Sequence, residues 1–187
     1  IFFFMFAVLN CRPFTHPEQK SRKHKAMTTL LEKLHALLFS NLGLVISNTH
    51  QEQESKEYFG CNFQLNSFQI KFRKAKVTPT KVGQFVTLWK RNSISKETEP
   101  FTSEDTSDFY LILTETSENF GFFLFTKDIL IKNQILSTNF KDGKRGFRVY
   151  PNWDIPQNKQ ATKTQNWQNQ FFIDFADEHY VEKFESI

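Results

Sequence analysis

The stretch DFYLILTETSENFGFFLF, residues 108–125, decides the fold class of this 187-residue chain. It contains two apolar runs, Phe109–Leu113 and Phe120–Phe125, whose aromatic and branched side chains favour β-strands. The polar segment between the runs, Glu115–Asn119, has the length of a hairpin connection. The stretch therefore predicts two consecutive strands joined by a short turn.

Further strands are expected on both sides of this hairpin. Alternating apolar residues predict strands around Phe63–Leu65 and Phe68–Phe72, with a turn or bulge at Asn66 and Ser67 between them. The runs QFVTLW (residues 84–89) and GFRVY (residues 146–150) predict two more. The remaining segments of this region are expected to be a connector at 77–83, a polar loop at 92–107, and a loop or short helix at 47–57.

Helical patterns lie before and after the strands. Five leucines between Leu30 and Leu38 form one apolar stripe, with a cap expected at Thr28 or Thr29 and a stop at Gly43. A short helix or turn is expected at 127–134, and a final helix from about Asn158, with Trp167, Phe171 and Phe175 on its inner face. The order helix, strands, helix predicts an α/β (α+β) single domain, a mixed β-sheet flanked by helices.

The first residues do not fit the pattern of the domain. Residues 1–9 are apolar but too few to span a bilayer, and the basic residues follow this run, whereas in a signal peptide they precede it. We expect residues 1–26 to be a disordered leader or upstream translation, and residues 27–187 to be the domain. A short membrane-surface anchor is the alternative.

Composition excludes several classes of protein. Aromatic residues make up 16% of the chain, enough to build a core, so global disorder is excluded. The two cysteines, Cys11 and Cys61, form no metal-binding spacing and are expected to be reduced. No P-loop, GxGxxG or GxSxG motif is present, and the five histidines show no ligand spacing. Four carboxylates could hold Mg²⁺, but nothing in their spacing singles them out: Glu54, Glu57, Asp108 and Glu115. We expect no catalytic residues, no metal site and no cofactor.

Charge is distributed unevenly, although the net charge is only +4. The segment 71–91 holds seven basic residues and no acid, and 97–118 holds seven acids and no base. The segment 141–163 is basic again. If the fold brings the two basic segments together, they form a positive face that can neutralise phosphates. The alternative is that these are solvated strand faces and loops.

Several stretches together resemble the MepB family over roughly residues 57–175. These are RKAKVTPTKVGQFVTLWKRN (73–92), DFYLILTE (108–115), NFGFFLFTKDILIKNQILSTN (119–139), KRGFRVYPNWDI (144–155) and NKQATKTQNWQNQFFI (158–173). The resemblance implies a bacterial, cytoplasmic protein with a fold similar to the restriction-endonuclease-like PD-(D/E)XK core. It also points to DNA.

A nuclease of that fold needs an acid on one strand and (Asp/Glu)-x-Lys on the next. The two strands that we would align, 68–73 and 84–90, carry basic and neutral polar residues, not carboxylates. We therefore expect a protein that binds nucleic acid, in the first place DNA, through a basic face without catalysis. The alternatives are a metal-dependent nuclease and an accessory domain that binds a small ligand or a protein, with segment 147–172 as the pocket wall. The predicted nucleic-acid-binding residues are Arg73, Lys74, Lys76, Lys81, Lys90, Arg91, Lys144, Arg145, Arg148 and Lys163.

Overall fold

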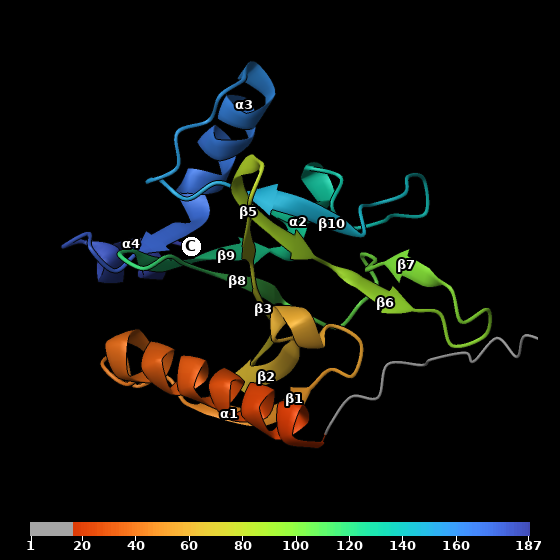
Figure 1. Cartoon of the computed structure of the whole chain (residues 1–187), viewed down its shortest axis with the longest axis horizontal. Coiled ribbons are helices and arrows are strands. Elements are labelled where there is room, and N and C mark those ends of the chain that lie inside the picture. Colours follow the sequence, from red (N-terminus) through yellow and green to blue (C-terminus); the bar gives the residue numbers. More distant parts are fainter. Residues whose placement is uncertain (1–16) are drawn as a thin grey trace, which may run out of the picture.

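A mixed six-stranded sheet forms the centre of the molecule, in a computed structural model that describes residues 17–187 (Figure 1). Its order is β1-β2-β3-β8-β9-β11, and all neighbours are antiparallel except the central pair β3 and β8. The strands are β1 (Ile46–Gln51), β2 (Cys61–Leu65), β3 (Phe68–Lys74), β8 (Phe109–Glu115), β9 (Phe120–Thr126) and β11 (Phe172–Asp174). The predicted hairpin is confirmed, because β8 and β9 pair along their whole length.

A smaller sheet packs over one face of the large sheet, and a two-stranded ribbon lies beside it (Figure 1). The three-stranded sheet has the order β10-β5-β4, and the ribbon pairs β6 with β7. Their bounds are β4 (Lys76–Thr78), β5 (Lys81–Thr87), β6 (Trp89–Arg91), β7 (Thr98–Pro100) and β10 (Gly146–Val149). The helices are α1 (Pro17–Leu34), α2 (Lys127–Lys132), α3 (Lys159–Gln168) and α4 (Tyr180–Glu185), with short turns η1 (His35–Phe39), η2 (Lys56–Tyr58) and η3 (Asn169–Phe171).

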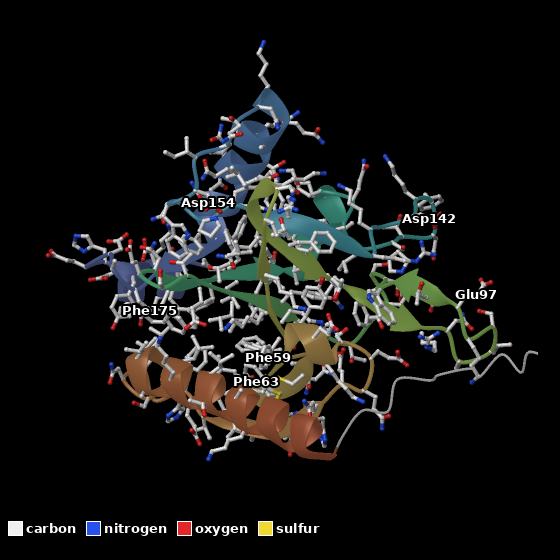
Figure 2. The ribbon with its side chains drawn as sticks, in the orientation of Figure 1. Phe59, Phe63, Glu97, Asp142, Asp154 and Phe175 are labelled. Atoms are coloured by element: carbon white, nitrogen blue, oxygen red, sulfur yellow. The ribbon has the colours of Figure 1, made fainter. Side chains whose placement is uncertain are left out.

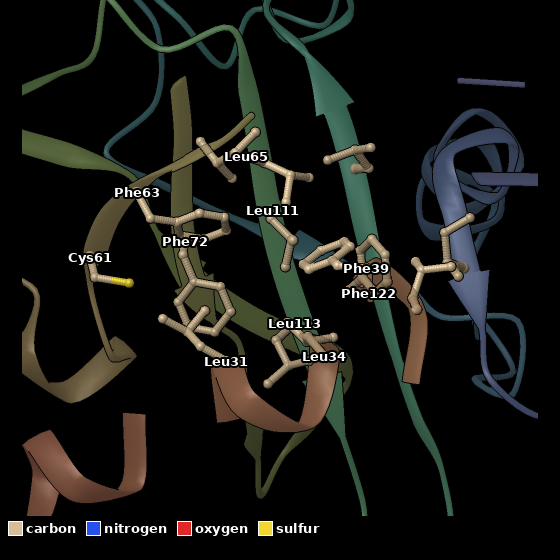
Figure 3. Close-up of a cluster of buried hydrophobic side chains, with 14 of the residues drawn as sticks. Leu31, Leu34, Phe39, Cys61, Phe63, Leu65, Phe72, Leu111, Leu113 and Phe122 are labelled. Atoms are coloured by element: carbon tan, nitrogen blue, oxygen red, sulfur yellow. The ribbon is translucent and has the colours of Figure 1, made fainter. Parts of the chain in front are cut away.

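Two hydrophobic cores lie on the opposite faces of the large sheet. Because successive side chains of a strand point to opposite faces, Leu111 and Leu113 of β8 face one core, while Tyr110 and Ile112 face the other. Figure 3 shows the first core, where α1 and the following turn pack on β2, β3, β8 and β9. The second core lies between the large sheet and β5 with β10, so the domain has the mixed α+β architecture that the sequence predicts.

The structure corrects several expected elements. Segment 47–57 contains β1, an edge strand whose residues are mostly exposed, and its pairing with β2 comes from tertiary contact since it has no apolar pattern of its own. The connector at 77–83 is a hairpin between β4 and β5, and the loop at 92–107 contains β7. Helix α1 begins at Pro17, so no cap exists at Thr28 or Thr29; the Thr29 hydroxyl donates to the Lys25 carbonyl within the helix.

The end of the chain differs most from the sequence prediction. Helix α3 ends at Gln168, the short turn η3 follows, and Phe172 then begins β11, which pairs with β9. The chain therefore crosses the edge of the sheet: Trp167 and Phe171 pack in the second core, whereas Phe175 packs in the first, against Phe120. The prediction that Trp167, Phe171 and Phe175 lie on the inner face of one helix is therefore wrong. The leader predicted for residues 1–26 lies largely outside the described residues.

Candidate nucleic-acid interface

A groove of about 1070 Å³ lies between α3, the β4–β5 hairpin and the segment that leads into β10. Figure 1 shows these elements together at the end of the molecule opposite α1. One wall is the hairpin turn, residues 79–82, and the other is the first half of α3 with residues 157 and 158 before it. Between them the groove is lined by Asn133, Ile135, Lys144, Phe147, Arg148, Tyr150 and Trp167.

The groove has its shape because β5, β10 and α3 are held together by specific contacts. Arg148 donates to the Gly83 carbonyl (3.0 Å) and to the Thr78 hydroxyl (2.8 Å), which ties β10 to the β4–β5 hairpin. Gly83 has φ +83°, and a Cβ there would lie 2.6 Å from the Tyr150 ring, so only glycine fits. The buried Gln168 amide bonds the backbone of both Arg148 and Tyr150 at 2.9 Å, which fixes α3 on β10.

The charged residues that line the groove all have the same sign. They are Lys81, Lys144, Arg148 and Lys163, and no Asp or Glu is among the lining residues. The three lysines are exposed, and none of them forms an ion pair with another described residue. Positive charges gathered in a concave surface without acids give a positive potential that attracts anions. The sequence prediction placed all four of these residues in the binding surface.

Most of the other predicted binding residues lie elsewhere and are paired with acids. Four of them form ion pairs at 2.5 to 3.1 Å between side-chain atoms: Lys74–Glu115, Lys76–Glu57, Lys90–Asp105 and Arg91–Glu54. The partners come from the acidic segment 97–118 and from residues 52–57. The first basic segment is therefore largely neutralised within the fold, whereas the second is not. Arg145 is exposed, and its Nε donates to the Thr98 carbonyl at 2.7 Å.

Arg73 is the clearest departure from the prediction. Its side chain is fully buried, and its guanidinium pairs with Glu52, whose other carboxylate oxygen accepts from Lys71 at 2.9 Å. Burial alone would raise the pKa of Glu52, but Arg73 and Lys71 outweigh it and hold that pKa below its ordinary value. Burial also disfavours the charged form of Lys71, and it lowers the pKa of Lys71 although the negative charge of Glu52 acts to raise that pKa. Because Arg73 cannot reach solvent, it belongs to the core and not to a binding surface.

The aromatic residues of the groove are held in place by the second core. Trp167 is partly buried, and its ring lies 5.4 Å from that of Phe125 between centroids. Phe147 and Tyr150 also line the groove. Sequence reasoning did not single out the neutral lining residues Asn133, Tyr150, Gln157 and Gln160. Tyr150, Gln157 and Gln160 lie within segment 147–172, the expected wall of a small-ligand pocket, whereas no sequence signal pointed to Asn133.

The acids considered as metal ligands in the sequence have other partners. Asp108 Oδ2 accepts from the Gln69 backbone N–H at 2.7 Å, and Glu115 pairs with Lys74. Among residues 25–187, no three His, Cys, Asp or Glu side chains cluster in a way that could hold a metal ion. The strands aligned for a nuclease site, around 68–73 and 84–90, lie in different sheets. Cys61 is buried and free, and burial raises the pKa of its thiol to about 12.

Over the same described part of the chain, no helix is long and apolar enough to cross a membrane. The search of curated proteins finds no match. Two solved structures are similar. A crystal structure of MepB shares 33% identity with a TM-score of 0.69, covering 71% of this chain and 89% of that one. A bacterial homing endonuclease shares 10% identity with a TM-score of 0.44, covering 89% and 95%, which is too weak to support an argument. The restriction-endonuclease-like core therefore stays a prediction.

The MepB-like family model matches residues 52–174. This range contains both strands of the β8–β9 hairpin, the β4–β5 hairpin, β10 and α3, and therefore every element that lines the groove. The match agrees with the stretches that resemble the family in the sequence. The chain is a member of the MepB-like family.

Proposed function

We propose that this protein binds nucleic acid, in the first place DNA, through the groove between α3 and the β4–β5 hairpin, and that it does so without catalysis. The observation that carries the proposal is the set of four basic side chains, Lys81, Lys144, Arg148 and Lys163, in a groove whose lining includes no acid. The phosphate groups of a nucleic-acid backbone can bind to such a surface, because one Lys or Arg can neutralise each phosphate.

The polar lining favours a polymer over a small apolar ligand. Small-molecule sites are typically about 300–1,000 Å³ in volume and lined mainly by apolar side chains. The groove has a volume of about 1070 Å³, and Asn133, Gln157, Asn158, Gln160 and Thr164 line it beside the basic residues. Neutral amides and hydroxyls are common partners of the sugar–phosphate backbone.

The proposal is tested by the salt dependence of binding. The folded protein is titrated against a fluorescently labelled DNA duplex, and anisotropy is measured at several salt concentrations between about 50 and 200 mM. Neutralisation of three to four phosphates gives a slope of log K against log salt of roughly −3 to −4. Absence of binding at the lowest salt, with the protein folded, contradicts the proposal. A parallel titration with RNA of the same sequence separates the two nucleic acids.

A second candidate function is an accessory domain that binds a small ligand. The observation that favours it is that three aromatic residues of segment 147–172 line the same groove: Phe147, Tyr150 and Trp167. A neutral small ligand would quench the fluorescence of Trp167 with little dependence on salt, whereas phosphate neutralisation gives the steep slope described above.

A further inference from the structure

Phe140 is the most exposed large apolar side chain of residues 25–187, with 98% of its surface accessible. Most of the aromatic rings in this chain contribute to the two cores, so this ring is an exception. Its neighbours along the loop, Thr138, Asn139, Lys141 and Asp142, are polar or charged. The ring is therefore isolated and does not extend an apolar patch.

The backbone that carries this ring is well fixed. Thr138 and Lys141 exchange backbone hydrogen bonds of 2.9 and 3.3 Å, which close a tight turn. Phe140 is one of the two residues between them in this turn. The loop returns to the core through Lys144, whose N–H donates to the Ile135 carbonyl at 2.9 Å. Gly143, just before Lys144, lies so close to the Ile135 backbone that a Cβ there would be 2.4 Å from the Ile135 carbonyl oxygen. The loop thus holds Phe140 out in solvent from a base anchored in the second core.

The same loop is positively charged and leads into the groove. Lys141, Lys144 and Arg145 are exposed, against one acid, Asp142, which Figure 2 places on this loop, well away from α1. Lys144 itself lines the groove. Phe140 is four residues away, so the two Cα atoms are at most about 14 Å apart. The two residues are therefore within reach of the same strand, since that upper limit corresponds to about four stacked nucleotides at 3.4 Å each.

An exposed aromatic ring among basic residues suits one class of partner. A protein interface needs a contiguous apolar centre, which the polar neighbours of Phe140 do not provide. A nucleic-acid base needs only one ring face for stacking, and the adjacent phosphates need cations. We propose that Phe140 stacks on an unpaired base of a strand whose phosphates lie along the groove, so that the protein prefers single-stranded or locally unpaired DNA to a perfect duplex. This inference rests on the proposed function.

The test compares two DNA probes and three substitutions at one position. The probes are a single-stranded oligonucleotide that carries 2-aminopurine and the same strand annealed to its complement; anisotropy gives affinity and 2-aminopurine fluorescence reports stacking. Phe140→Ala should weaken binding of the single strand roughly tenfold or more and of the duplex less than about twofold. The salt slope should not change, because the ring contacts no phosphate. Phe140→Leu should behave as Phe140→Ala, and Phe140→Trp as the wild type.

Two control variants separate this inference from the proposed function. Ile94→Ala removes another large apolar side chain, 91% exposed on the β6–β7 loop, and should leave both affinities unchanged. Lys163→Ala should weaken binding to both probes and flatten the salt slope. If Lys163→Ala acts so and Phe140→Ala has no effect on the single strand, the stacking inference is wrong and the groove stands. If Phe140→Leu keeps full affinity, the contact is apolar and not stacking. If neither probe binds to the wild type, both proposals fail.

Discussion

Arg73 and Glu52 form an ion pair in the interior of the protein, with the guanidinium fully buried and the carboxylate also bonded to Lys71. Two cations therefore share one carboxylate on the face of the large sheet that packs against the smaller one. Replacing Glu52 would leave both buried cations without this carboxylate, with the neutral oxygens of Asn62 and Phe72 as their remaining hydrogen-bond acceptors, which is far more costly than loss of an exposed ion pair.

We expect Glu52→Gln to lower the free energy of unfolding by about 3–5 kcal/mol at neutral pH, measured by urea denaturation. Because the pKa of Glu52 is lowered in the folded state, its contribution is present above the ordinary glutamate pKa of about 4.3. It is lost as the pH falls through the folded-state value. The difference between wild type and variant should therefore shrink in acid.

Glu54→Gln is the matched control, since Glu54 pairs with Arg91 at the surface. It should leave stability nearly unchanged at either pH. Equal stabilities for Glu52→Gln and Glu54→Gln would show that the buried pair does not stabilise the fold.

Lys163 and Lys76 provide the second prediction, because both were expected to bind nucleic acid but only one lines the groove. Lys163 has no ion-pair partner among the described residues, whereas Lys76 pairs with Glu57 at 2.9 Å. In a duplex-DNA titration, Lys163→Ala should reduce the steepness of the salt slope by about one unit. Lys76→Ala should leave the slope as in the wild type. The opposite pattern would move the interface from the groove to the β3–β4 side.

Phe172 and Phe171 provide the third prediction, because adjacent rings at the end of the chain have different environments. Phe172 is 1% exposed, and its ring lies 4.5 Å from that of Phe123, whereas Phe171 is only partly buried. Phe172→Ala should cost about 3–5 kcal/mol of unfolding free energy because it leaves a cavity between the sheet and Trp153. Phe171→Ala should cost clearly less. Thermal and urea unfolding of both variants measure the difference.

Periodicity predicted the central elements of the fold because their burial follows from their own residues. The β8–β9 hairpin, the strands around Phe63 and Phe72, and the start of α3 near Asn158 were all predicted. Strand β1 and strand β11 were missed for opposite reasons. Ile46–Gln51 has little apolar pattern and is a strand only because β2 pairs with it. Phe171 and Phe175 continue the helical spacing of Trp167, but α3 ends at Gln168, the turn η3 follows, and Phe172–Asp174 pair with β9.

The sequence predicted only part of the candidate site, because it does not show which basic residues form ion pairs with acids in the fold. The runs of charge identified the basic residues, but a run of charge along the chain does not show which acids approach it in the fold. The acids of residues 52–57 and 97–118 neutralise Lys74, Lys76, Lys90 and Arg91, and burial removes Arg73. Lys81, Lys144, Arg148 and Lys163 come together only because β5, β10 and α3 pack side by side.

The last prediction is that the protein does not cleave nucleic acid with a divalent metal ion. Metal-assisted hydrolysis needs carboxylates that converge on one ion beside the scissile phosphate. Asp108 and Glu115 precede and end the same strand, seven residues apart, so their side chains point to opposite faces. Each also has another partner: Asp108 binds the Gln69 backbone, and Glu115 binds Lys74. The proposed groove brings four cations to the DNA, and these would repel Mg²⁺ as they attract phosphate.

Incubation of labelled single-stranded and duplex DNA with the protein and Mg²⁺ or Mn²⁺ should leave the strands intact under conditions in which they are bound. Cleavage that requires the metal and is abolished in Asp108→Ala or Glu115→Ala, with DNA binding retained, would instead make the protein a nuclease and the groove its substrate-binding surface.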